Sequence, residues 1–277
     1  MIVHLVDGTY ELFRHFYGIR RGVKTDPKYG AVAGVLYTIA QMIDGGATHI
    51  GVATDHVIES FRNDMWAQYK TGLGIERALR SQFIPLENAL VAMGIAVWPM
   101  VELEADDALA SGALIASRDK HVQKVYIWTP DKDLAQCVVG DRVVQVDRRS
   151  NKIRDADGIV AKFGVPPSLI PDYLALVGDS SDGYPGIKSI GPKTAVRLLS
   201  KYGPIEAFPP EVLGANSEIA MLFKRLATLR TDAQLFKKVD ELRWQGTTKA
   251  FAAVAEMIGD ARLAPRILEL EKKLQKQ

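Results

Sequence analysis

The sequence is poor in three features that would each point to a class of protein. Its single cysteine, Cys137, excludes an intramolecular disulfide and a cysteine-rich zinc site, and its place in the apolar run 134–139 favours a buried small hydrophobe over a nucleophile. The chain has no run of about 18 apolar residues and no signal-type segment at its start. A net charge of +2 is too small to indicate nucleic-acid binding by itself. We therefore expect a cytoplasmic protein without a membrane partner, whose basic surface is local.

The first 150 residues alternate strand-like with helix-like segments. Apolar, β-rich runs at residues 2–6, 49–54, 124–130 and 143–146 predict strands, and helical spacing of apolar residues at 10–17 and 34–43 predicts helices. A strand–helix–helix–strand order implies a parallel sheet with right-handed crossovers. The composition, with 47% hydrophobic and 25% charged residues, is that of an ordinary globular protein. We predict an α/β core, with enough chain left for a smaller module.

Carboxylates are concentrated at the ends of the predicted strands. Asp7, Asp55 and Asp131 directly follow strand-like runs, and Asp133 lies two residues further on. Because the carboxyl ends of parallel strands share one edge of a sheet, these side chains should converge there. Such a concentration of negative charge needs a cation, and hard oxygen ligands select Mg²⁺ or Mn²⁺. This edge predicts a metal site, whereas we interpret Asp147, which also ends a strand, as part of a surface turn.

The densest acidic stretch, residues 102–107, leads into a helix-like segment at 108–115. It contains Glu102, Glu104, Asp106 and Asp107. Acids in the first turn of a helix are favoured by the amide dipoles, so plain capping is one interpretation. The aspartates at the strand ends favour the other, which is that this stretch belongs to the metal edge.

Residues 61–74 mix basic with aromatic side chains and end in glycines. Arg62, Tyr69 and Lys70 lie in this segment, and Arg77 and Arg80 follow shortly after it. One interpretation is a polar helix with a flexible loop. The other is an element that grips phosphates with its cations and stacks aromatic faces on unpaired bases.

The second region carries a turn and then a basic hairpin. Asp179 and Asp182 lie in the turn, where aspartate is also a common turn former. Residues 183–204 hold four basic residues and no acid, and Pro192 stands where a helix would begin. Such a hairpin can present backbone amides to a phosphate without reading bases. A P-loop is a poor interpretation because Pro192 precedes Lys193 and no strand comes before the hairpin.

Taken together, these motifs resemble the 5′ nuclease (flap endonuclease) superfamily, most closely the bacterial 5′→3′ exonuclease domain that occurs alone or at the N-terminus of DNA polymerase I. The matching segments are 5–8 with Arg14, Asp55, 61–62, 69–70, 104–107, 130–133, 177–182, 186–195 and 229–232. The resemblance implies a PIN-like catalytic domain at 1–165, with a mainly parallel sheet, helices on both faces and a helical arch at about 61–84. It also implies a helical DNA-binding region at 166–277, with a helix–three-turn–helix (helix-hairpin-helix) motif at about 183–203.

The resemblance also assigns roles to single residues. One metal ion would be held by Asp7, Asp55, Glu104 and Asp106, and a second by Asp131, Asp133 and Asp182, with Asp106 or Asp107 near both and with Asp107 and Asp179 in the outer shell. Arg62 and Lys70 would reach the scissile phosphate, and Tyr69 would stack on an unpaired base. DNA would be contacted by Arg14, Gly186, Lys188, Ser189, Gly191, Lys193, Thr194 and Arg197, and K⁺ would lie in the hairpin on backbone carbonyls, as at Ile187 and Ile190.

One departure from the family concerns the arch. Relatives usually carry an arginine three residues after the lysine of the Tyr-Lys pair, but here that position is Leu73, and the segment is about one residue shorter. Arg77 or Arg80 could substitute from the next helical turn.

The expected function is a structure-specific 5′ nuclease that uses two Mg²⁺ or Mn²⁺ ions to cleave flapped or nicked DNA. Its implied setting is replication and repair, including removal of RNA primers from Okazaki fragments, by a monomer in the bacterial cytoplasm at the nucleoid. An aspartyl-phosphate phosphohydrolase is disfavoured because that chemistry needs an aspartate at position 5, which is leucine. A branched-DNA-binding protein that has lost the chemistry is the other alternative, and the full set of carboxylates argues against it.

Overall fold

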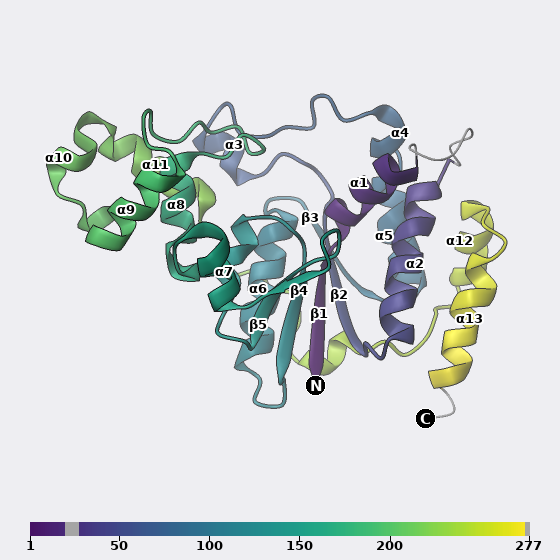
Figure 1. Ribbon diagram of the computed structural model, residues 1–277. Coiled ribbons are helices and arrows are strands. Elements are labelled where there is room, and N and C mark those ends of the chain that lie inside the picture. Colours follow the sequence, from purple (N-terminus) through teal and green to yellow (C-terminus); the bar gives the residue numbers. More distant parts are fainter. Residues whose placement is uncertain (20–27, 275–277) are drawn as a thin grey trace.

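The computed structural model describes residues 1–19 and 28–274. Its centre is a six-stranded sheet in the order β3-β2-β1-β4-β5-β6 (Figure 1). Five strands are parallel, and β6 pairs antiparallel with β5 at the edge. The strands are β1 (Ile2–Asp7), β2 (His49–Asp55), β3 (Ala96–Met100), β4 (Lys124–Trp128), β5 (Val143–Asp147) and β6 (Lys152–Arg154). The predicted mainly parallel sheet is confirmed.

Both faces of this sheet are covered by helices. The helices α1 (Gly8–Ile19), α2 (Gly30–Asp44) and α5 (Phe83–Ala92) share one core with Val6 and Val52. Helix α6 (Ala105–Arg118) packs on the opposite face against Leu5 and Ile127. Strands that are buried on both sides are apolar almost throughout, which explains why the sequence shows continuous apolar runs there.

The helical region forms its own core beside the sheet. Its helices are α7 (Ala156–Phe163), α8 (Ile170–Val177), α9 (Pro192–Tyr202), α10 (Pro210–Leu213) and α11 (Ser217–Ala227). Short 3₁₀ turns lie at Asp133–Cys137, Pro167–Leu169, Ile205–Ala207, Gly214–Asn216 and Val239–Leu242. Leu174 of α8 and Phe223 of α11 belong to this core. The hairpin between α8 and α9 is therefore anchored to the hydrophobic core that α8 and α11 share.

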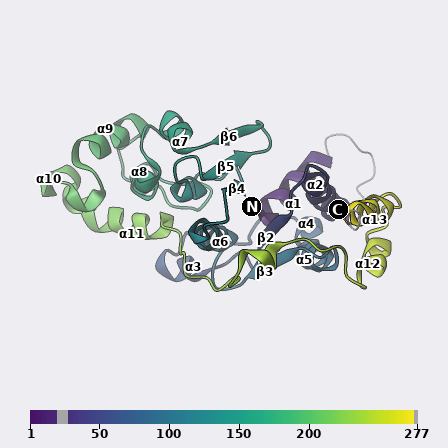
Figure 2. The same cartoon turned by 90° about the horizontal axis from the view of Figure 1, so that it is seen from below.

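The chain after α11 returns to the α/β core. Trp244 donates its backbone N–H to Thr48 O at 2.8 Å and its indole N–H to Met93 O at 2.8 Å. The last helices, α12 (Phe251–Ile258) and α13 (Leu263–Leu274), share the core of α2 and α5. Figures 1 and 2 show α12 and α13 on the side of the sheet away from α8–α11. The expected unit 166–277 is thus divided between a helical region and a segment that packs on the α/β core.

The segment expected to form a helical arch is helical only in short pieces. Helix α3 (Phe61–Met65) and helix α4 (Arg77–Arg80) stand at its two sides, and residues 66–76 between them are not helical. Figure 1 shows this stretch crossing above the carboxyl-terminal edge of the sheet from α3 to α4. Gly74 has φ +85° and Gly72 donates its N–H to Glu59 Oε1 at 3.0 Å, so the backbone follows turns here. The expectation of a helical arch is wrong for residues 66–76.

Among residues 1–19 and 28–274, no helix has the length and apolar character that crossing a membrane requires.

Candidate active site

The strand-end aspartates meet at one edge of the sheet, as the parallel order requires. Asp7 ends β1 and Asp55 ends β2. Asp7 accepts the backbone N–H of Tyr10 at 2.8 Å and the Thr129 hydroxyl at 3.0 Å. Asp55 accepts the backbone N–H of Ala105, the first residue of α6, at 2.8 Å. These bonds fix Asp7 beside the first turn of α1 and Asp55 beside the start of α6.

Five aspartates form two overlapping groups next to this edge. Ligand oxygens of Asp106, Asp131 and Asp133 all lie within 4.8 Å of one another, and so do those of Asp133, Asp179 and Asp182. Asp133 therefore belongs to both groups. The turn that carries Asp179 is closed by paired backbone hydrogen bonds with Tyr184, at 2.8 and 3.0 Å. Acids from three separate stretches of the chain, at 106, 131–133 and 179–182, are thereby brought to one place.

The electrostatics of these groups call for a cation. Burial raises the pKa of Asp7 to about 7, and the charges of Asp55 and Asp131 add to the effect. Burial, followed by the charge of Asp131, also raises the pKa values of Asp106 and Asp133 well above the ordinary range. Buried Asp133 Oδ1 has no hydrogen-bond partner among the described residues. Crowded buried carboxylates with an unsatisfied oxygen fit a hard divalent cation such as Mg²⁺ or Mn²⁺.

Two lysines partly neutralise the acids. Lys70 Nζ lies 2.6 Å from Glu104 Oε2 and 3.4 Å from Asp182 Oδ1, and its side chain is 26% exposed. Burial opposes the charge of Lys70, but Glu104 and Asp182 outweigh it and raise its pKa well above the ordinary value. Lys132 Nζ lies 2.8 Å from Asp179 Oδ2. Sequence analysis missed Lys132, although its place between Asp131 and Asp133 was a usable signal.

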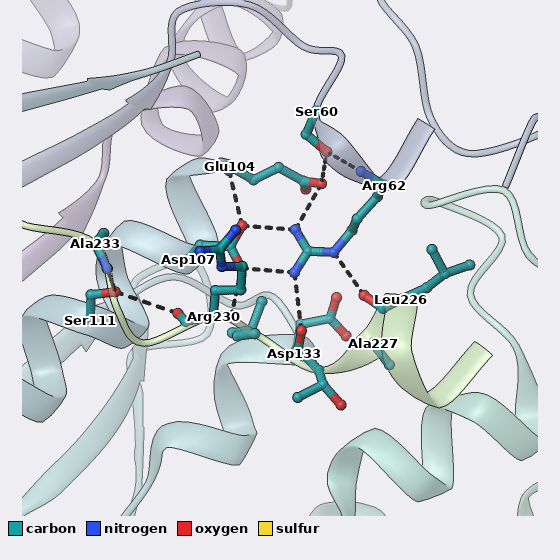
Figure 3. Close-up of polar contacts among 12 residues, drawn as sticks. Ser60, Arg62, Glu104, Asp107, Ser111, Asp133, Leu226, Ala227, Arg230 and Ala233 are labelled. Atoms are coloured by element: carbon teal, nitrogen blue, oxygen red, sulfur yellow. Dashed lines mark hydrogen bonds and ion pairs between the residues drawn. The ribbon is translucent and has the colours of Figure 1, made fainter. Parts of the chain in front are cut away.

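Arg62 does not reach toward a substrate in this structure. It is 1% exposed, and its guanidinium forms a two-pronged ion pair with Asp107, with nitrogen–oxygen distances of 2.7 and 2.8 Å (Figure 3). Asp107 is fully buried and also accepts the backbone N–H groups of Glu104 and Arg230. The expectation that Arg62 contacts the scissile phosphate is therefore wrong for this conformation. Asp107 belongs to neither aspartate group, and its expected place in the outer shell of the metals stays a prediction. Each of these charges is already satisfied by the other and by the backbone.

Tyr69 is also buried. It is 3% exposed, and its hydroxyl lies 3.3 Å from Glu104 Oε2. The expectation that its ring stacks on an unpaired base is wrong for this conformation. Arg77 and Arg80, by contrast, are exposed on α4. Leu73 is 88% exposed, so the tip of this loop presents an apolar side chain to solvent.

Glu104 lies in a network of hydrogen bonds and ion pairs. Its Oε1 accepts the Ser60 hydroxyl at 2.6 Å and Arg62 Nη1 at 3.1 Å, and its Oε2 faces Lys70. Burial favours the neutral acid, but Lys70 and Arg62 outweigh burial and lower the pKa of Glu104. It is not a member of either aspartate group, so its role as a metal ligand stays a prediction.

The acidic turn and the loop that carries Lys70 are fitted closely together. Lys70 N–H donates to Asp182 O at 3.0 Å, and Trp66 Nε1–H donates to Gly183 O at 3.0 Å. A Cβ on Gly183 would lie 2.0 Å from Gln68 O, and its φ is +81°. Only glycine allows this approach, which sets Lys70 beside Asp182.

We expect Gly183→Ala to lower the free energy of unfolding by roughly 3 kcal/mol, because it adds a clash to an unfavourable φ. Gly259→Ala is the matched control: its φ is +78° and its ψ 14°, in the left-handed helical region, but nothing lies within 4 Å of the added Cβ. It should cost only about 1 kcal/mol. Urea unfolding of both variants measures the difference, and equal losses would mean that the contact with Gln68 is unimportant.

The hairpin between α8 and α9 presents basic and small residues to solvent. Lys188, Ser189, Lys193 and Arg197 are exposed, and Gly191 precedes α9 directly. Thr194 is half-buried in the first turn of α9. Gly186 has φ +71° and packs on Gly178, where a Cβ would lie 2.3 Å from Gly178 N. Ile187 is buried and its carbonyl accepts the N–H of Ile190 at 2.9 Å.

Arg14 stands on α1 and is already paired. Its Nη2 lies 2.5 Å from Glu11 Oε2 and 3.3 Å from the Thr38 hydroxyl. The side chain remains 31% exposed. Its predicted contact with DNA stays a prediction and would have to compete with the ion pair to Glu11.

Comparison with known proteins identifies the class to which this fold and acidic edge belong. The family model described as "5'-3' exonuclease, N-terminal resolvase-like domain" matches residues 2–164, and "5'-3' exonuclease, C-terminal SAM fold" matches residues 165–250. The chain therefore belongs to the 5′-3′ exonuclease family, whose members are nucleases. This confirms the resemblance seen in the sequence motifs.

Relatives of similar length support this membership. The chain is 31% identical over 248 residues to a 5'-3' exonuclease of Buchnera aphidicola, covering 82% of this chain and 81% of that protein. It is 30% identical over 254 residues to a 5'-3' exonuclease of Aquifex aeolicus, covering 87% and 86%. It is 34% identical over 259 residues to DNA polymerase I of Pseudomonas aeruginosa, covering 86% of this chain but only 28% of that protein.

Solved structures show the same fold at low identity. A T5 5'-exonuclease with bound zinc has a TM-score of 0.66 and 18% identity, with 98% of this chain and 99% of that chain covered. The catalytic core of Rad2 in complex with a DNA substrate has a TM-score of 0.62 and 13% identity, with 96% and 91% covered.

Proposed function

We propose that the protein is a structure-specific, divalent-metal-dependent 5′ nuclease that hydrolyses DNA near the junction of single and double strands at 5′ flaps and nicks. The observation that carries the proposal is the pair of aspartate groups that share Asp133. Several of these acids are buried, and the two lysines beside them do not balance their charge. No structural need for so many acids at one edge is evident, and perturbed carboxylates of this kind are typical of catalytic sites.

Two cations would be held by the two groups. Asp106, Asp131 and Asp133 would hold one, with Asp7 and Asp55 beside them, and Asp133, Asp179 and Asp182 would hold the other. Bound divalent cations supply an activated water at neutral pH and stabilise the charge on the transferring phosphoryl group. Hard carboxylate ligands favour Mg²⁺ or Mn²⁺ in this role.

The chain's own cations would position the phosphate. Lys70 reaches the acids from the loop above the sheet edge and keeps a quarter of its side chain exposed. An ammonium held between Glu104 and Asp182 can contact a phosphate oxygen that approaches the acids, and it stabilises charge that builds up during cleavage. Arg77 and Arg80, exposed on α4, would contact the flap strand at a greater distance.

The hairpin before α9 would bind the duplex. Its exposed cations and the amides at the start of α9 suit the phosphate backbone, which is contacted without reading the sequence. K⁺ would bind at the backbone carbonyls of the hairpin, including those of Ile187 and Ile190. The bacterial 5'-3' exonucleases and DNA polymerase I among the relatives support a role in DNA replication and repair. RNA-primed 5′ ends as substrates and a monomeric active form are part of the proposal.

We expect Lys193→Ala to weaken binding of flap DNA and to reduce the salt dependence by about one counterion, because one phosphate contact is lost. The cleavage rate at saturating enzyme should not change. Lys201→Ala, on an exposed lysine at the other end of α9, is the control and should leave affinity near wild type. Fluorescence anisotropy at several salt concentrations measures both, and equal effects of the two variants would contradict docking through the hairpin.

The decisive test is cleavage of a 5′-labelled double-flap DNA, with EDTA, Mg²⁺ or Mn²⁺, and mapping of the product ends. Release of the flap at the junction, strictly dependent on the metal, is the expected result. Tight binding without product under all three conditions would instead show a branched-DNA-binding protein.

A further inference from the structure

The Arg62 guanidinium joins three separate parts of the chain (Figure 3). Nη1 and Nη2 donate to the two oxygens of Asp107 at the start of α6, and Nη1 also donates to Glu104 Oε1 at 3.1 Å. Nε donates to Leu226 O at 2.8 Å and Nη2 to Thr228 O at 3.2 Å. A guanidinium has five N–H donors, and these five bonds employ all of them.

Stability alone is a weak explanation for this arrangement. Arg62 is 1% exposed and Asp107 is fully buried, so both charges have lost their hydration. The desolvation cost of a buried ion pair often exceeds its attraction, and apolar side chains of similar size usually serve stability as well or better. A fully bonded fork instead fixes the relative positions of the groups it contacts.

The contacted groups belong to two functional regions. Leu226 and Thr228 stand at the end of α11, where the last carbonyls of a helix lack partners within the helix. Helix α11 packs with α8, which leads into the hairpin proposed to bind duplex DNA. On its other side the guanidinium contacts Glu104, whose second oxygen faces Lys70 at the acidic edge. One side chain thus bridges the end of the helical region and the catalytic acids.

We propose that Arg62 is a positioning residue that couples the seating of α11 to the placement of Glu104 and, through Glu104, of Lys70. The coupling rests on the proposed nuclease function. Cleavage, rather than DNA affinity, depends on this side chain, because its contacts end at the catalytic edge and none of them is available to the substrate.

The test compares Arg62→Lys with Ser111→Ala. Lysine keeps the charge but cannot hold Asp107, Glu104 and the two carbonyls together. Ser111 of α6 also binds the chain that follows α11, through Arg230 O at 3.4 Å and Ala233 N at 3.1 Å. It has no hydrogen bond to Glu104 among the described residues. We expect Arg62→Lys to lower the single-turnover rate at least about tenfold. Its affinity for flap DNA in EDTA should stay within about twofold of wild type, and Ser111→Ala should match wild type in both.

The proposal is overturned if Arg62→Lys keeps the wild-type rate, or if Ser111→Ala loses as much rate. Thermal melting shows that each variant is folded at the assay temperature. If Arg62→Lys is not, Asp107→Asn replaces it, because it loosens the guanidinium from the other side and should produce the same loss of rate.

A second readout separates this proposal from the nuclease function itself. Calorimetric titration with Mn²⁺, without DNA, is performed on the wild type, Arg62→Lys, Glu104→Gln and the double variant. Lys70 is shared between Glu104 and Asp182, an acid of the second aspartate group, so a displaced Glu104 leaves Lys70 to compete with a cation for Asp182. Positioning through Glu104 therefore predicts that Arg62→Lys weakens Mn²⁺ binding in the wild type but adds nothing in the Glu104→Gln background. Equal weakening in both backgrounds, or none in the wild type, argues against it. If the wild type binds Mn²⁺ but cleaves no flap, the proposed nuclease function is refuted. The Mn²⁺ affinities of the four proteins then still decide whether Arg62 positions Glu104.

Discussion

Replacing Asp133 by asparagine is expected to lower the single-turnover rate of flap cleavage by roughly a thousandfold or more, because one change removes a charged ligand from both aspartate groups. Flap DNA should still bind, and binding in EDTA should tighten slightly as a negative charge is lost near the phosphates. Asp147→Asn is the matched control. Asp147 also ends a strand, but it accepts bonds from Arg149 and Ser150 in a turn outside both groups. Its variant should keep the wild-type rate.

The Asp133→Asn variant should lose activity but gain stability in the absence of metal. Asp133 is 4% exposed, and its Oδ1 has no hydrogen-bond partner among residues 1–19 and 28–274. A neutral amide removes a buried charge that other aspartates repel. In metal-free buffer Asp133→Asn should therefore melt at a higher temperature than wild type, while Mn²⁺ should raise the melting temperature of the variant less than that of wild type. Cleavage within about tenfold of wild type would place Asp133 outside the site.

The catalytic edge could be predicted because the rules that create it are local and topological. A strand that ends on aspartate is visible in the sequence, and a parallel sheet must bring such ends together. Asp7, Asp55 and Asp131 lie at this edge for that reason. The hairpin before α9 was equally visible, because glycine, proline and basic residues mark it within a short span.

The burial of Arg62 could not be predicted, because it is decided by partners remote in the chain. Leu226 and Thr228 lie 164 and 166 residues away from Arg62. From residue type alone, an arginine near a phosphate site is expected to bind phosphate. Only the folded structure shows that the N–H donors of Arg62 are already used by Asp107 and by the carbonyls of Leu226 and Thr228. Tyr69 was misread for the same reason, since it fills the space beside Glu104.

The course of the chain at its end was also hidden from the sequence. The apolar positions of α13 indicate an amphipathic helix but not the surface that it covers. Ile267 and Leu270 pack into the core of α2 and α5, on the far side of the sheet from the hairpin (Figure 1).

Residues 66–76 form short turns in place of the expected helix. Glycines and the hydrogen bond from Gly72 to the Glu59 side chain outweigh helical propensity there.

Replacing Lys70 by methionine is expected to lower the single-turnover rate about a hundredfold, which is the usual loss when one preorganised charge at a reacting group is removed. Methionine keeps the apolar stem packed but leaves Glu104 and Asp182 without the cation that lies 2.6 and 3.4 Å from them. DNA affinity should fall less than about fivefold, because a single phosphate contact contributes little to total binding.

Lys224→Met tests whether this loss reflects the place of Lys70 or merely the removal of a bridging lysine. Lys224 Nζ also joins two carboxylates, at 2.7 Å from Asp172 and 2.6 Å from Glu206, but in the helical region away from the acids. This variant should lose stability and keep the rate, since the two lysines share their type of bonding and differ in location. An unchanged single-turnover rate in Lys70→Met, or an equal loss in Lys224→Met, would mean that Lys70 only neutralises buried acids and does not act on the phosphate.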